Sequence, residues 1–116
     1  NKIALMQKAV IYRDVAAIAV WDQPLPENIK LITAQAADDL LNVERVQAAF
    51  TLFEDRAGIN FSARSLGAVN VQIIMEYLGG GGHQTMAGTL IKDISLEKAV
   101  EELKKSIDKY IKDMKI

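Results

Sequence analysis

The residues best suited to chemistry lie in one segment, GGGGHQTMAG, which runs from Gly79 to Gly88. Its four consecutive glycines, Gly79, Gly80, Gly81 and Gly82, leave their backbone N–H groups uncovered by side chains. N–H groups exposed in this way can bind a phosphate or a sugar-phosphate. Glycine inside a helix or strand costs about 0.5–1 kcal/mol of stability relative to alanine. The plainer interpretation of the run is a helix end followed by a turn, but one or two glycines would be enough for that. A run of four therefore favours phosphate binding.

His83 is the only histidine of the chain, and it follows the glycines directly. An imidazole N–H can donate a hydrogen bond to a phosphate oxygen. A metal site built on this side chain is not predicted, because the chain has no second histidine and no cysteine to complete a ligand set. The alternative is a histidine that only packs against the glycine loop.

Arg64 lies inside an apparent strand, INFSARS, where a charged side chain needs solvent, an acidic partner or a ligand. A guanidinium can hold a phosphodiester with two hydrogen bonds, so Arg64 is a candidate phosphate clamp. The alternative is an ion pair with Glu54 or Asp55 across a predicted hairpin. Ser62 and Ser65 flank Arg64 and are candidate hydroxyl donors.

Composition and charge limit the partners of the chain. Its 116 residues are enough for one domain with one core. A net charge of −1 argues against broad electrostatic contact with duplex nucleic acid. The absence of cysteine excludes disulfides. Adjacent carboxylates such as Asp38 and Asp39 point in different directions on a helix, so they are interpreted as solvent-exposed side chains rather than a catalytic pair. Because the first residue is Asn1 rather than methionine, the chain is predicted to be part of a longer protein.

The first half of the chain predicts alternating strands and helices. Residues 9–12 form a short apolar run, and residues 15–21 (VAAIAVW) have the pattern of a strand buried on both faces. Helical spacing of apolar residues follows at 27–41. Residues 46–53 and 59–65 then predict a hairpin in which Gly58 is available for positive φ. In its second strand, Ser62 and Arg64 share one face.

The second half predicts two helices around one more strand. Asn70 is a good N-cap for a helix whose apolar stripe runs from Val71 to Leu78 and which the glycine run terminates. A strand is expected at 85–91. Ser95 would cap a last helix, which is expected to bury Leu96, Val100, Leu103, Ile107, Ile111 and Met114. The order of these elements predicts an α/β fold with a mixed β-sheet flanked by helices.

Together, the residues INFSARSLGAVNVQIIMEYLGGGGHQTMAG resemble the C-terminal DHH-associated domain of the DHH phosphoesterase superfamily. The most specific motifs are SARS at 62–65, NVQ at 70–72 and GGGGH at 79–83. Within the superfamily, this form is most similar to membrane-anchored bacterial cyclic-di-AMP phosphodiesterases. The resemblance covers residues 15–116 as the substrate-binding domain, and it makes residues 1–14 a linker or strand from an upstream DHH domain.

The resemblance implies a division of labour between two domains. The DHH domain would hold two manganese ions that activate water. The present chain would hold a cyclic dinucleotide or short nucleotide with its glycine loop, His83, Arg64 and Ser65, and with Ser62 as a weaker candidate. No catalytic residue and no metal ligand is assigned to this chain, so the chain alone is expected to be inactive. The resemblance also implies a cytoplasmic domain of a protein anchored in the bacterial membrane.

Three alternatives remain open at the level of sequence. The same loop could serve an oligoribonuclease or nucleotide phosphatase. A related domain ends alanyl-tRNA synthetases, so a nucleic-acid-binding module without catalysis is a second alternative, although the acidic pI argues against it. A homodimer formed through an apolar sheet face or the last helix is the third.

Overall fold

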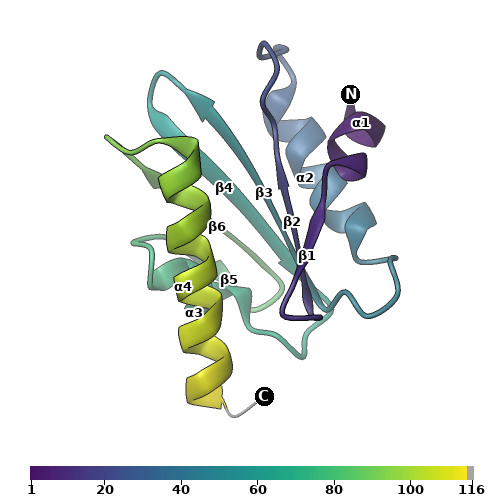
Figure 1. The fold of residues 1–116 in the computed structure, drawn as a ribbon, viewed down its shortest axis with the longest axis vertical. Helices are drawn as coiled ribbons and strands as arrows, with labels where there is room; N and C mark the ends of the chain where they lie inside the picture. Colours follow the sequence, from purple (N-terminus) through teal and green to yellow (C-terminus); the bar gives the residue numbers. More distant parts are fainter. Residues whose placement is uncertain (115–116) are drawn as a thin grey trace.

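A mixed six-stranded sheet with helices on both faces forms the framework of the computed structural model, which describes residues 1–114 (Figure 1). The strand order is β1-β2-β3-β4-β6-β5. Strands β2 and β3 run parallel because α2 connects them, and all other neighbours are antiparallel. The predicted α/β class is therefore confirmed. The elements are α1 (Lys2–Gln7), β1 (Val10–Tyr12), β2 (Ala16–Val20), α2 (Ile29–Leu40), β3 (Ala48–Asp55), β4 (Gly58–Ser65), α3 (Val71–Glu76), β5 (Gly81–His83), β6 (Met86–Ile91) and α4 (Leu96–Met114).

Helices cover the two faces of the sheet with separate apolar clusters. Figure 1 shows α4 in front of the sheet and α2 behind it. The cluster under α3 and α4 contains Ile18 and Phe50, whereas the cluster under α1 and α2 contains Ala17 and Phe53. Strands β2 and β3 contribute to both clusters. For β2, the continuous apolar run at residues 15–21 predicts this burial on both faces.

The hairpin of β3 and β4 follows the sequence prediction closely. Asp55 pairs with Gly58 at the turn, where Gly58 has a φ of +138°. Burial alternates along β4, and its buried residues Ile59, Phe61 and Ala63 belong to the α3 and α4 side. Alternation therefore places the Arg64 side chain on the other face of the sheet, toward α2.

The short helix α3 begins at Asn70, as predicted. The Asn70 side-chain oxygen accepts hydrogen bonds from the backbone N–H groups of Gln72 and Ile73 at 3.1 and 3.4 Å. The Asn70 N–H itself donates to the Tyr110 hydroxyl at 2.8 Å, which links α3 to α4. We expect Asn70→Ala to lower the free energy of unfolding by about 1 kcal/mol, since two backbone donors lose their partner. Urea denaturation of the chain measures this loss, and an unchanged midpoint would contradict it.

The N-terminal segment contains a helix that the sequence analysis does not predict. Six residues, Lys2–Gln7, form α1, and only Leu5 among them is buried. A single buried residue produces no apolar period, so the helix leaves no recognisable pattern in the sequence. The Asn1 side chain caps it by accepting from Ala4 N at 2.8 Å. Strand β1 follows and pairs with β2 at the edge of the sheet.

The last helix begins as predicted but buries a somewhat different stripe. Ser95 accepts a hydrogen bond from Lys98 N at 3.0 Å, which confirms the cap. The prediction that Met114 is buried is wrong, because Met114 ends the helix one turn beyond Tyr110 and Ile111 and is 45% exposed. Within residues 1–114, no helix combines the length and the apolar character that a membrane span requires.

Candidate functional site

The first two glycines of the run terminate α3. The Gly80 N–H donates to the Met75 carbonyl at 2.9 Å and the Gly79 N–H donates to the Glu76 carbonyl at 3.0 Å. Gly79 has a φ of +84°, a conformation that glycine adopts without strain at a helix C-terminus. The plainer interpretation of the run, a helix end and turn, therefore accounts for this part of it.

Close backbone packing accounts for two of the glycines, but not for Gly81. A Cβ on Gly80 would lie 2.2 Å from the Gly88 carbonyl oxygen, and one on Gly82 would lie 2.5 Å from the Met86 oxygen. Gly82 also has a φ of +144°. A Cβ on Gly81, in contrast, would meet no atom within 4 Å, and the backbone there has no positive φ. Gly81 is therefore the glycine of the run that the fold itself does not require.

The end of the glycine run is a strand rather than the loop that the sequence predicts. Residues Gly81–His83 form β5, which pairs with β6 across a two-residue turn. In the register of the sheet, Met86 lies opposite Arg64 on β4 and also opposite His83 on β5. Directly opposed residues of antiparallel strands point to the same face, so the three side chains share the α2 side of the sheet. We call Arg64, Met86 and His83 the cross-strand row.

Arg64 is held by a partner that the sequence analysis did not identify. Its Nε lies 3.3 Å from Oδ1 of Asp38 on α2, and its side chain is 13% exposed. Its NH1 donates to the Ala63 carbonyl at 2.9 Å, while the buried Nε makes no hydrogen bond within residues 1–114. The alternative that the sequence left open, an ion pair with Glu54 or Asp55, is not formed, because these residues lie at the turn end of the hairpin and Arg64 lies at the opposite end.

The two candidate serines lie on opposite faces of β4. Ser65 is buried, and its hydroxyl donates to the Gln84 carbonyl at 3.3 Å and accepts from the Gly67 N–H at 3.2 Å. Ser62 lies opposite Gly88 and shares the face of Arg64. The geometry therefore gives Ser65 a structural contact and leaves Ser62 as the hydroxyl beside the cross-strand row.

The turn between β5 and β6 is tied to the segment that follows β4. The Gln84 side-chain amide donates to the Gly67 carbonyl at 2.7 Å, and the Gln84 carbonyl accepts from the Val71 N–H at 3.0 Å. The Ser65 N–H donates to the Thr85 carbonyl at 3.1 Å. These bonds fix His83, which precedes the turn, relative to the end of β4. Sequence reasoning missed Gln84 because a polar residue in a turn gives no distinctive pattern.

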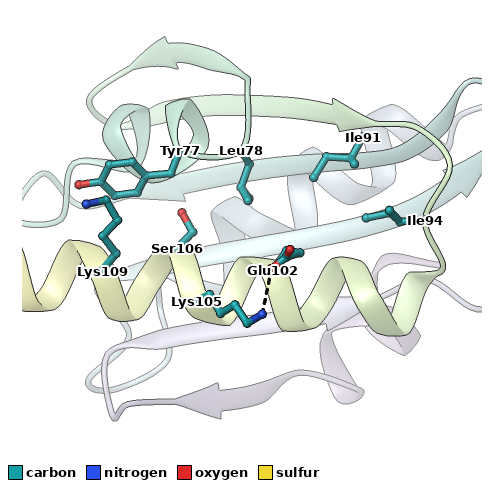
Figure 2. Close-up of a pocket in the computed structure, with 8 residues that line it drawn as sticks. All are labelled: Tyr77, Leu78, Ile91, Ile94, Glu102, Lys105, Ser106 and Lys109. Atoms are coloured by element: carbon teal, nitrogen blue, oxygen red, sulfur yellow. Dashed lines mark ion pairs between the residues drawn. The ribbon is translucent and has the colours of Figure 1, made fainter.

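A pocket of about 400 Å³ lies on the other face of the sheet, between α3, β6 and α4 (Figure 2). Leu78, Ile91 and Ile94 give it an apolar lining, and Lys109 approaches the Tyr77 ring to 5.0 Å. Its polar side chains already have partners within the chain, so the pocket offers few free donors for a phosphate.

Polar contacts at the pocket rim neutralise its charges. Lys105 pairs with Glu102 at 3.6 Å, the dashed contact in Figure 2, and Ser106 donates to a backbone carbonyl at 2.7 Å. A hydrogen bond from Lys109 lowers the pKa of the Asp113 carboxyl below its ordinary value. Desolvation, with the Asp113 charge adding to it, raises the pKa of Tyr77. Both shifts belong to an exposed surface network rather than to a catalytic pair.

The described part of the chain does not fit a metal ion. Within residues 1–114, no three side chains of His, Cys, Asp or Glu come close enough together to hold one. The cross-strand row offers one imidazole and one guanidinium, and a guanidinium is not a metal ligand. Within the described residues, the row therefore provides no ligand set for a metal.

Comparisons with known proteins identify relatives of the chain by sequence. The chain is 47% identical over 116 residues to the cyclic-di-AMP phosphodiesterase GdpP of Bacillus subtilis, covering 95% of this chain and 17% of that protein. It is also 47% identical over 110 residues to the cyclic-di-AMP phosphodiesterase PdeA of Listeria monocytogenes, covering 93% of this chain and 16% of that protein. The chain thus spans about a sixth of the length of these relatives.

The fold also matches a solved structure. An exopolyphosphatase-related protein of Bacteroides fragilis superposes with a TM-score of 0.79 at 23% identity, over 99% of this chain and 36% of that one. The family model of the DHHA1 domain matches residues 15–113. The chain therefore belongs to the DHHA1 domain family.

Proposed function

We propose that this chain is the substrate-binding domain of a metal-dependent phosphodiesterase that hydrolyses cyclic-di-AMP to pApA. The observation that carries the proposal is the cross-strand row, in which a guanidinium and an imidazole point to one face of the sheet beside the bare backbone of Gly81. The two relatives at 47% identity, which are cyclic-di-AMP phosphodiesterases, support the choice of nucleotide.

The residues of this chain would bind and orient the phosphodiester. The NH1 group of Arg64 donates to the Ala63 carbonyl, and its Nε faces the Asp38 carboxylate. These two contacts would fix the plane of the guanidinium for contact with a phosphate oxygen. His83 is exposed at the other end of the row and can donate a hydrogen bond to another polar group of the same dinucleotide. Holding the phosphodiester in one orientation lowers the entropic cost of the attack on phosphorus.

The chemistry itself would belong to an upstream DHH domain. Manganese held there would supply the activated water, since the described residues here do not fit a metal. We accordingly propose that the chain alone has no hydrolase activity, and that the whole protein is anchored in the bacterial membrane with this domain in the cytoplasm. Residues 1–14 would connect the two domains through α1 and β1.

An assay of three substrates tests the proposal. A protein that joins this chain to its DHH domain is incubated with manganese and, separately, with cyclic-di-AMP, pApA and short RNA. We expect cyclic-di-AMP to be hydrolysed with the highest kcat/KM and pApA to accumulate, while the isolated chain gives no product. Faster turnover of pApA or RNA would replace the proposal with the oligoribonuclease or phosphatase alternative.

A further inference from the structure

We infer that Met86 is the residue of the proposed site that contacts a nucleobase, an inference that rests on the proposed function. Met86 occupies the middle of the cross-strand row, between Arg64 and His83. Its side chain is 51% exposed, so the fold does not use it as core. A ligand that contacts both polar side chains would also contact this large apolar side chain. This arrangement favours a ligand that has an apolar part.

The spacing of the strands places Met86 beneath any ligand that both polar groups hold. Neighbouring strands lie about 4.8 Å apart, so the backbones of Arg64 and His83 are about 10 Å apart across β6. A molecule that reaches from one side chain to the other must therefore pass over Met86. An inorganic phosphate is too small to do so, whereas a nucleotide is long enough.

The surface beside Met86 suits a flat ring. The next row on this face consists of Ser62, Gly88 and Gly81, two of which have no side chain. Gly81 has open space where a Cβ would point. A planar base can thus lie against the Met86 thioether and over bare backbone. Contacts between methionine sulfur and an aromatic ring are favourable, and the flexible side chain adapts to the ring.

The test compares two inhibitors that differ only in their bases. The inhibition constants of pApA and of its abasic counterpart, in which hydrogen replaces both adenines, are measured against cyclic-di-AMP turnover by the protein with both domains. We expect Met86→Ala to raise the inhibition constant of pApA about threefold to tenfold and to leave that of the abasic compound unchanged. Met86→Leu, which conserves side-chain volume, should restore most of the pApA affinity.

Met114→Ala is the matched control, because Met114 is also an exposed methionine, 45% accessible, but lies at the end of α4. It should change neither constant. An unchanged pApA constant in Met86→Ala overturns the inference, and so does an equal rise for both inhibitors, which would mean that Met86 contacts something other than a base. Arg64→Ala should weaken both inhibitors. If it weakens neither, the proposed function fails, whatever Met86 does.

Discussion

Replacing Arg64 by alanine is expected to lower kcat/KM for cyclic-di-AMP about 10²–10³-fold in a protein that contains both domains. The guanidinium is 13% exposed and oriented by Asp38 and the Ala63 carbonyl, so it is in place before substrate arrives. Such a donor stabilises charge that develops on the phosphate oxygens in the transition state. His83→Ala should reduce the same parameter to a similar extent, and steady-state kinetics with saturating manganese measures both losses.

Arg45→Ala is the matched control for this experiment. Arg45 also pairs with an aspartate, Asp14 at 3.3 Å, but its side chain is 70% exposed and lies in the connection between α2 and β3. Its removal should leave kcat/KM within about twofold of the parent value, because exposed ion pairs contribute little. Normal turnover by both Arg64→Ala and His83→Ala would remove these residues from the substrate site, provided that the variants bind manganese normally.

The glycine run should separate into positions that support the fold and one that supports binding. We expect Gly82→Ala to lower the free energy of unfolding by about 2–5 kcal/mol, because alanine there is strained at a φ of +144° and its Cβ would overlap the Met86 oxygen at 2.5 Å. Gly81→Ala should leave the stability within about 0.5 kcal/mol of the parent. Urea denaturation of this chain, followed by circular dichroism, compares the two variants.

Substrate binding should be affected by Gly81→Ala even though this substitution leaves the stability almost unchanged. The Cβ of Gly81→Ala would occupy the open space beside the cross-strand row, so the folded variant should bind cyclic-di-AMP more weakly. A stable Gly81→Ala protein with an unchanged KM would show that the substrate does not approach this backbone. An unaltered unfolding midpoint in Gly82→Ala would contradict the packing described for β5 and β6.

Local patterns were sufficient to predict most of the framework. Alternation assigned the faces of β4, the double-sided burial of β2 followed from its unbroken apolar run, and Asn70 and Ser95 were recognised as caps. These features depend on residues a few positions apart, whose relation the helical or extended backbone fixes by itself. Helix α1 escaped prediction because Leu5 alone among its residues is buried.

The sequence by itself thus determined the α/β class, the separation of Arg64 from the apolar face of its strand, and the choice of the glycines and the histidine as candidates for phosphate binding. Only the tertiary structure decided that β6 lies between β4 and β5, so that Met86 separates Arg64 from His83. It also showed that Arg64 pairs with Asp38 and not with Glu54 or Asp55. The physical reason is that backbone hydrogen bonds between strands are alike for every pair of strands, so the order and register of the sheet are set by the packing of the whole chain.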